Sequence, residues 1–335
     1  MRTISLCVLL IATLSAAAEE PMAATKHRTD WFKDAGWGVF THYLVGSEMP
    51  AEDWNKRVDA FDVPGLVAQL EAIGTKVYFI TIGQNSGHYC APNPTYDKLV
   101  GIEPSKCSRR DLIADLYRAL EPKGIRLMVY LPSGAPAADH VARKKLGWLW
   151  GGKGGWQLPG EPVGGRLAEF QTRWEAVIRD WATRWGKHVH GWWFDGCYFA
   201  DVMYRTPEPP NFASLAAAAR AGNPDSIVAF NPGVKYPIVR HSDQEDYTAG
   251  EINEPAKAPC AGRWLDGAQW HMLSYLGHTW GNGAPRFSNE QAIKWTRDII
   301  KHGGVATWDV PIQANGHIAQ PFIEQLIALR KGLEK

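Results

Sequence analysis

The chain has 335 residues, of which 45% are hydrophobic and 21% are charged, and its formal net charge is +1. This length suits one large domain or two ordinary ones, with enough apolar residues for a substantial core. Because the charge is nearly balanced, we expect neither a nucleic acid nor an anionic membrane as partner.

The N-terminal residues have the pattern of a secretory signal peptide. Arg2 provides a positive start, 6–14 is a short apolar run, and small residues precede a cleavage point at Glu19. The apolar run is too short to span a bilayer, and no other segment has the pattern of a membrane span. We therefore expect a secreted or periplasmic protein, with a signal peptide over 1–18 and a loose N-terminal extension over 19–30.

From Trp31 onwards, segments typical of strands and of helices alternate. The strand candidates are short and rich in β-branched and aromatic residues, and the helix candidates carry apolar residues at helical spacing. Strands are expected at 37–43, 76–83, 125–131, 191–195, 226–230 and 304–310, with weaker candidates at 246–251 and 268–274. Helices are expected at 63–73, 110–123, 167–186, 212–221, 289–302 and 321–331.

This alternation implies an α/β fold with a parallel sheet. Seven or eight strands over about 300 residues suit a (β/α)8 TIM-like barrel, which we expect to form a single domain over 31–335. A doubly wound open sheet is the alternative, but no Gly-x-Gly-x-x-Gly follows the first strand. The glycine-rich connection over 132–165 is unusually long, and such connections are usually functional.

The cysteines left after removal of a signal peptide are Cys90, Cys107, Cys197 and Cys260. In an exported protein they could form disulfides in three pairings, with Cys90 and Cys107 the nearest pair in sequence. No zinc-ligand spacing occurs, so we expect no metal and no cofactor. An acidic cluster, Asp243, Glu245 and Asp246, could bind a cation, but a solvated loop face is the better interpretation.

Polar residues at the carboxyl ends of barrel strands converge on one pocket. Asp195 ends a short aromatic strand, and Gly196 allows a sharp turn after it. An aspartate that merely caps the next element is the plain alternative. Neutral hydrogen-bonding groups, a few carboxylates and flat tryptophan faces would suit a neutral polyol. Further candidates near strand ends are His42, Trp54, Gln84, Asn85, Trp193, Asn231, Glu251, His271, Trp280 and Asp309.

Several motifs occur in an informative order. They are Trp-Phe-Lys-Asp-Ala-Gly-Trp-Gly-Val-Phe-Thr-His over 31–42, Asp53-Trp54, Trp193-Phe194-Asp195-Gly196 and Trp280-Gly281. Together they resemble the α-L-fucosidases of glycoside hydrolase family 29, in which the third motif is similar to the segment that carries the nucleophile. The resemblance runs from about Trp31 to the last expected helix.

The resemblance implies a retaining exo-glycosidase that hydrolyses an α-L-fucosyl or related deoxy-sugar linkage in an oligosaccharide or glycoconjugate. Asp195 would be the nucleophile that forms a glycosyl-enzyme, while a second carboxyl group protonates the leaving oxygen. His42 would hydrogen-bond a sugar hydroxyl, and Trp54 would pack on the ring. The other substrate-binding residues would be Asp53, Gln84, Asn85, Trp193, Asn231, His271 and Trp280.

The chain also departs from that family. Gln84 and Asn85 stand where the family has two histidines, and His271 follows Trp270 where the acid/base glutamate is expected. We also expect no C-terminal β-sandwich. Glu251, at the end of a candidate strand, is our candidate acid, with Glu254 and His271 as alternatives.

Two other classes of function remain open on the sequence alone. One is a barrel that binds carbohydrate without hydrolysing it, and the other is a structural protein with a decayed site. The discriminating feature is whether a carboxyl group other than that of Asp195 reaches the pocket. A retaining mechanism predicts two carboxyl groups about 5–5.5 Å apart.

Overall fold

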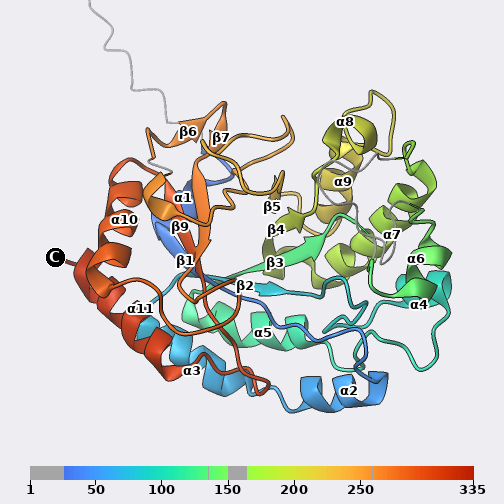
Figure 1. Cartoon of the computed structure of the whole chain (residues 1–335), viewed down its shortest axis with the longest axis horizontal. Coiled ribbons are helices and arrows are strands. Elements are labelled where there is room, and N and C mark those ends of the chain that lie inside the picture. Colours follow the sequence, from blue (N-terminus) through green and yellow to red (C-terminus); the bar gives the residue numbers. More distant parts are fainter. Residues whose placement is uncertain (1–25, 135, 150–163, 258–259) are drawn as a thin grey trace, which may run out of the picture.

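The computed structural model describes residues 26–134, 136–149, 164–257 and 260–335 (Figure 1). The expected signal peptide and most of the N-terminal extension lie outside the described residues, as do residues 135 and 150–163 of the long connection. In the described part of the chain, no helix is both long enough and apolar enough to cross a membrane.

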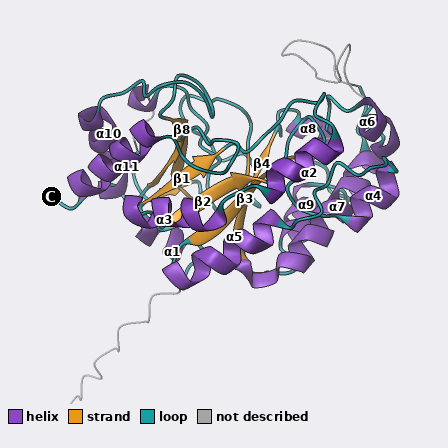
Figure 2. Ribbon diagram, turned by 90° about the horizontal axis from the view of Figure 1, so that it is seen from below, coloured by secondary structure: helices purple, strands orange, loops and turns teal. Residues whose placement is uncertain are grey.

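Seven parallel strands form one curled sheet in the order β5-β4-β3-β2-β1-β9-β8. Helices such as α3, α5 and α11 pack around the outside of the strands (Figures 1 and 2). The strands are β1 Trp37–Thr41, β2 Val77–Thr81, β3 Arg126–Pro132, β4 Val189–Asp195, β5 Ile227–Phe230, β8 His271–Tyr275 and β9 Val305–Asp309. A separate antiparallel pair is formed by β6 Trp264–Leu265 and β7 Ala268–Gln269.

The helices include the six that the sequence pattern predicts, together with shorter ones. They are α1 Asp30–Ala35, α2 Ala51–Asp59, α3 Val63–Ile73, α4 Pro94–Val100, α5 Leu112–Leu120, α6 His140–Leu146, α7 Ala168–Trp185, α8 Ala200–Met203, α9 Phe212–Ala219, α10 Asn289–Lys301 and α11 Gln320–Leu333. Three short 3-10 turns lie at Glu121–Lys123, Gly186–His188 and Pro255–Lys257.

Local chemistry explains where these helices begin and what they bury. At α3, the Asp62 carboxylate accepts the Gly65 backbone N–H at 3.0 Å, and the helix ends at Gly74 with φ 80°. Along α7, Trp174, Trp181 and other apolar residues recur at helical spacing and are buried. Tryptophan in this helix therefore fills the core.

The sheet is a curled half-barrel of seven strands, so the predicted barrel-like α/β domain with a parallel sheet is confirmed, whereas the barrel of eight strands is not closed. The predicted strand over 246–251 meets its neighbours only through isolated bridges, Tyr247 to Gln269 and Glu251 to Leu273. It occupies the place of the missing strand, between β5 and β8, without a continuous ladder on either side.

Two carboxylates replace the backbone ladder on the β5 side. The Val228 N–H donates to Asp246 Oδ2 at 2.8 Å, and the Phe230 N–H donates to Glu245 Oε1 at 2.8 Å. The Asp246 N–H in turn donates to the Val228 carbonyl at 3.0 Å. Acidic side chains that bond nearby backbone groups compete with regular strand pairing, which explains the interrupted strand. We refer to these contacts as the seam.

The acidic cluster is thus largely structural. Asp246 pairs with Arg28 at 2.8 Å and with Arg220 at 2.6 Å, and burial raises the pKa of Glu245 to about 8. The disulfides considered from the sequence are not formed. All four cysteines, Cys90, Cys107, Cys197 and Cys260, are buried and free.

Candidate active site

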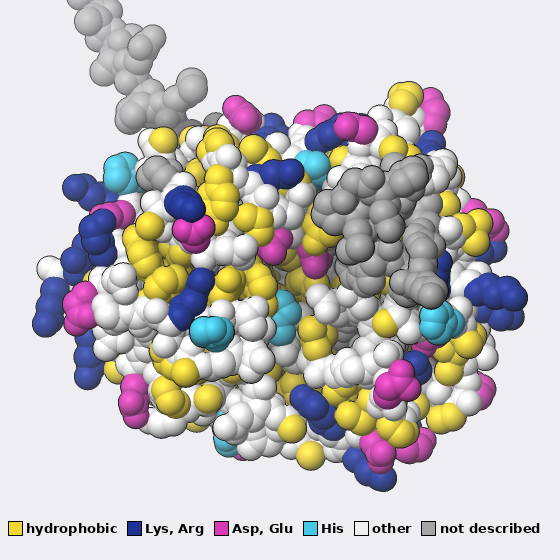
Figure 3. Space-filling model, viewed as in Figure 1, with side chains coloured by type: hydrophobic (Ala, Val, Ile, Leu, Met, Phe, Trp, Pro, Cys, Tyr) yellow, Lys and Arg dark blue, Asp and Glu magenta, His cyan; other side chains and the backbone are white. Residues whose placement is uncertain are grey.

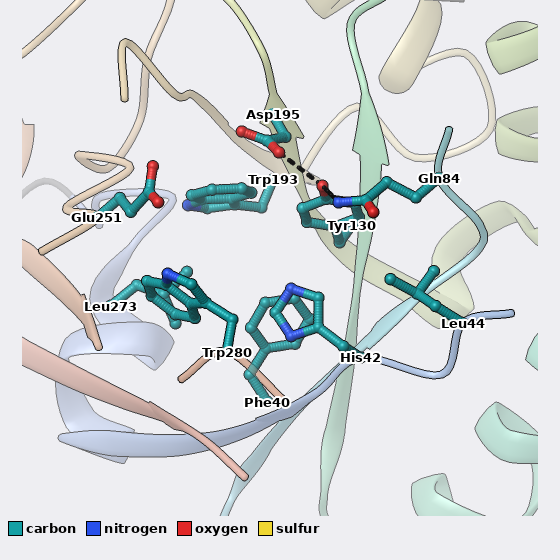
Figure 4. A pocket seen from close by; sticks show the side chains of 10 residues that line it. All are labelled: Phe40, His42, Leu44, Gln84, Tyr130, Trp193, Asp195, Glu251, Leu273 and Trp280. Carbon is teal, nitrogen blue, oxygen red and sulfur yellow. Dashed lines mark hydrogen bonds between the residues drawn. The ribbon is translucent and has the colours of Figure 1, made fainter. Parts of the chain in front are cut away.

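A cavity of about 230 Å³ lies where the carboxyl ends of the strands meet (Figure 4). On the face of the molecule that Figure 3 shows, acidic and histidine side chains lie among hydrophobic side chains near the middle. The cavity is lined by Phe40, His42, Leu44, Gln84, Tyr130, Trp193, Asp195, Glu251, Leu273 and Trp280. Strand ends, together with the loops that follow them, therefore build this site.

Asp195 is the last residue of β4, and four donors hold its carboxylate. Oδ1 accepts the Gly196 N–H at 2.7 Å, the Asn231 amide at 2.8 Å and, more weakly, the Tyr198 hydroxyl at 3.3 Å. Oδ2 accepts the Tyr130 hydroxyl at 2.6 Å. Gly196 has φ 76°, a conformation that glycine adopts without strain, so the chain can turn back to donate to the preceding carboxylate.

Asn231 connects the two carboxyl groups of the cavity. Its Nδ2 atom donates to Asp195 Oδ1 at 2.8 Å and to Glu251 Oε2 at 2.6 Å. Its Oδ1 atom accepts the Gly233 N–H at 3.0 Å, so the amide nitrogen must face the carboxylates. The sum of the two donor distances is an upper limit for the separation of the bonded oxygens, and this limit is shorter than the about 6.5–9.5 Å between the carboxyl groups of inverting glycosidases.

Glu251 is the last residue of the irregular segment 246–251. It forms an isolated bridge to Leu273 of β8, whereas the seam joins the start of this segment to β5. Burial raises the pKa of Glu251 to about 7, and the nearby Asp195 carboxylate adds to this rise. The hydrogen bond from Asn231 opposes the rise because it favours the ionised form. Glu251 can therefore hold or release a proton near neutral pH.

His42, just after β1, is oriented by a buried carboxylate. Its Nδ1 atom bonds to Asp309 Oδ1 at 2.7 Å, and Asp309 also accepts the Gly281 N–H. Burial lowers the pKa of His42, whereas the Asp309 carboxylate raises it, with smaller contributions from Asp195 and Glu251. The net result is a pKa above the ordinary value of histidine. No described residue is bonded to Nε2, which leaves this nitrogen available for a ligand.

Aromatic and amide side chains complete the cavity wall. Trp193 stacks on Tyr130 with the ring centres 5.4 Å apart, and its Nε1–H donates to the Ala249 carbonyl at 2.9 Å. Trp280 meets His42 edge-on at 6.0 Å. Gln84 donates its side-chain amide to the Tyr130 hydroxyl at 2.6 Å. The predicted candidates Gln84, Trp193 and Trp280 therefore lie together with the carboxylates.

Other predicted site residues lie away from this cavity lining. Trp54 is buried in the core and donates to the Tyr89 carbonyl at 3.0 Å, while Asp53 pairs with Lys56 on the surface. His271 begins β8, so it lies at the opposite end of the strand from the cavity. It is fully buried and bonded to Thr248 and Thr307, and burial lowers its pKa to about 4.

Of the remaining candidates, Glu254 is exposed and pairs with Lys257 at 2.7 Å. Asn85 accepts the Ala138 N–H through its backbone carbonyl at 2.9 Å and is not part of the lining. Among the described residues, no group of three or more His, Cys, Asp or Glu side chains is placed to hold a metal ion.

Tyr130 and Asp309 are among the residues of the site that were missed as candidates for binding or catalysis. Tyr130 falls inside an apolar strand pattern, where an aromatic residue is expected to face the core. Its place one residue before the end of the predicted strand was the available signal. Asp309 was recognised as a strand-end residue, but nothing in the sequence pointed to its contact with His42.

No protein-family model and no curated protein sequence matches this chain. Solved structures do match. The endo-fucoidan hydrolase MfFcnA4 of glycoside hydrolase family 107 aligns with TM-score 0.69 and 17% identity over 90% of this chain and 53% of its own. The endo-fucoidan hydrolase MfFcnA9 of the same family aligns with TM-score 0.68 and 18% identity over 90% of this chain and 63% of its own.

The α-L-fucosidase AlfC from Lactobacillus casei, solved with its α-L-fucose product, aligns over nearly its whole length. Its TM-score is 0.62 and its identity 15%, over 92% of this chain and 98% of its own. The present chain thus spans between half and two thirds of the two hydrolases above and nearly all of AlfC. At these identities the likeness concerns the fold, which this chain shares with glycoside hydrolases of both kinds and not with family 29 in particular.

Proposed function

We propose that this protein is an exported retaining exo-glycosidase that hydrolyses an α-L-fucosyl or related deoxy-sugar linkage, with Asp195 as nucleophile and Glu251 as acid/base. The observation that carries the proposal is the single Asn231 nitrogen bonded to both carboxyl groups. This shared donor keeps the two bonded oxygens nearer to each other than the about 6.5–9.5 Å between the carboxyl groups of inverting enzymes, which need that space to admit a water, and it thereby supports a retaining mechanism.

The electrostatics of the pair match the two roles. Four donors fix the Asp195 carboxylate, as a nucleophile requires. Glu251, with its pKa raised to about 7, is substantially protonated at neutral pH and can protonate the leaving oxygen. After Asp195 has bonded to the anomeric carbon, Glu251 has lost its proton and can take one from the attacking water.

The cavity supports a small sugar unit as ligand. Its volume of about 230 Å³ is below the about 300–1,000 Å³ of pockets for drug-sized ligands, as expected for one monosaccharide. Apolar surfaces from Phe40, Leu44, Trp280 and others face polar groups such as His42 Nε2, a division that suits a sugar with one apolar side. The choice of fucose rests on the names of the structural neighbours, and the proposed export rests on the N-terminal sequence.

A carbohydrate-binding barrel without hydrolysis is the alternative function. Such a binding protein would lack a second carboxyl group in the pocket. Glu251, however, lines the same cavity as Asp195. This observation favours the enzyme over the binding protein.

The test is turnover of a panel of aryl glycosides, led by 4-nitrophenyl α-L-fucoside, with wild type and Asp195→Asn side by side. The aryl leaving group makes turnover visible even if proton donation is weak. We expect wild-type activity and loss of it in the variant, because the amide cannot form the glycosyl-enzyme. Asp201→Asn is the matched control, since Asp201 is an exposed residue on α8 that pairs with Arg205 and does not line the cavity.

Absence of turnover with every member of the panel, together with measurable sugar binding by calorimetry, would replace the enzyme with the binding protein. Full activity in Asp195→Asn would remove Asp195 from the mechanism.

A further inference from the structure

Resting on the proposed function, we propose that Tyr130 is a further catalytic residue and that Asp195 attacks through Oδ2. Tyr130 lines the cavity, and its hydroxyl lies 2.6 Å from Oδ2. In this assignment the tyrosine holds the attacking oxygen before the reaction and stabilises the charge that returns to it when the glycosyl-enzyme is hydrolysed.

The two oxygens of Asp195 have different surroundings. Oδ1 accepts from Gly196, Asn231 and Tyr198, so its lone pairs are already occupied. Oδ2 accepts from Tyr130 alone among the described residues. A carboxylate oxygen offers about two lone-pair sites, which leaves one on Oδ2 for a bond to carbon.

Gln84 fixes the direction of the tyrosine hydrogen bond. Its side-chain nitrogen donates to the Tyr130 oxygen at 2.6 Å. A phenol carries a single proton, and an ionised carboxylate has none, so the Tyr130 proton must point to Asp195 Oδ2. Figure 4 shows this chain of contacts from Gln84 through Tyr130 to Asp195. Gln84 is a positioning residue in this arrangement, rather than the substrate-binding residue that the sequence predicts.

The hydrogen bond affects the two chemical steps in opposite directions. In the first step, an electron pair of Oδ2 forms the bond to the anomeric carbon, the bond to the leaving oxygen breaks, and that oxygen takes the Glu251 proton. The Tyr130 bond then weakens, because an ester oxygen is a poorer acceptor than a carboxylate.

In the second step, water attacks the anomeric carbon and gives a proton to Glu251, and the carbon–Oδ2 bond breaks with its electron pair returning to Asp195. The Tyr130 bond strengthens again as the charge returns. Tyr130 therefore promotes the second step more than the first, because it makes the Asp195 carboxylate a better leaving group.

The experiment is steady-state and stopped-flow kinetics of Tyr130→Phe with 4-nitrophenyl α-L-fucoside. Hydrogen bonds to charged groups contribute about 1.5–3 kcal/mol, so we expect kcat to fall about 10- to 100-fold. We expect KM to fall with kcat, because kcat/KM reports the first step, which changes less. We also expect a burst of about one nitrophenolate per enzyme, because the glycosyl-enzyme accumulates. Gln84→Leu should shift the same parameters in the same direction by less.

Tyr78→Phe is the matched control. Tyr78 is a fully buried tyrosine on the neighbouring strand β2, with its hydroxyl 2.6 Å from Thr41 Oγ1, and it does not line the cavity. It should leave kcat and KM unchanged. Equal losses of kcat and kcat/KM in Tyr130→Phe without a burst would overturn the assignment of Tyr130, and so would no loss at all. In either case the proposed function would stand, provided that the wild type turns over the substrate and needs Asp195 to do so. A wild type that turns over no substrate would remove the proposed function and this inference together.

Discussion

The protonation of Glu251 gives the sharpest test of the mechanism. Burial and the charge of Asp195 raise its pKa to about 7, and the first step needs the protonated form. With an alkyl or glycosyl α-L-fucoside, the wild-type kcat/KM should therefore fall tenfold per pH unit above about pH 7. The sign follows from the role as acid, since activity is present below the pKa and lost above it.

Glu251→Gln removes the proton donor and keeps the shape of the side chain. General acid catalysis contributes about 10²–10⁴-fold, and this contribution is needed only when the leaving group is poor. We expect kcat/KM to fall by that factor for an alkyl or glycosyl α-L-fucoside and only several-fold for the 4-nitrophenyl substrate. The fall in activity above about pH 7 should disappear with the carboxyl group.

The assay is a pH–rate profile of kcat/KM for both substrates with wild type, Glu251→Gln and Glu254→Gln. Glu254 is the matched control because it is exposed on the same connection and was the alternative acid. An alkaline limb that persists in Glu251→Gln, or equal losses with both leaving groups, would refute the assignment of Glu251. A profile changed by Glu254→Gln instead would transfer the role to that residue.

Three further predictions concern Asn231, Glu251 and Asp309. Asn231→Leu should lower kcat/KM by about tenfold or more, since bonds to charged groups are lost. It should also move the alkaline limb upwards, because Asn231 lowers the pKa of Glu251; a limb that stays in place would contradict this.

Glu251→Gln should stabilise the protein at pH 8 by up to about 3 kcal/mol, because a carboxyl group whose pKa rises from 4.5 to about 7 on folding costs stability as pH rises through that window. Urea denaturation should show this gain at pH 8 and none at pH 4. Asp309→Asn should lower the pKa of His42, which Asp309 raises, and raise KM; an NMR titration of the imidazole that matches wild type would contradict it.

Hydrophobic pattern predicted most of the sheet, because each strand is a short apolar run bounded by turns. The strands at 37–43 and 76–83 form as Trp37–Thr41 and Val77–Thr81. The pattern could not predict that 246–251 would remain irregular, since the contact of two acidic side chains with β5 depends on tertiary structure. Helix α2, which buries Trp54, Asn55 and Val58 among charged residues, was also missed.

Reasoning from strand ends predicted the two carboxylates and the histidine of the site, but it did not predict every other residue correctly. Asp195 and His42 lie at the cavity because one ends β4 and the other follows β1 at the same edge of the sheet, and Glu251 ends the irregular segment that fills the gap beside them. His271 was misplaced because it falls in the middle of the candidate strand over 268–274, whereas β8 begins at that residue. Tyr130 was missed because a tyrosine in a largely apolar stretch is indistinguishable in sequence from a core tyrosine.

The seam between β5 and residues 246–251 also bears on association between molecules. The edge strand of a sheet can template pairing with another chain where its N–H and C=O groups are not bonded by other parts of the protein. On β5, the outward N–H groups of Val228 and Phe230 are bonded to Asp246 and Glu245. Carboxylates placed there cannot donate a return bond to an incoming strand. The contacts that interrupt the barrel should therefore also disfavour pairing of β5 with another chain.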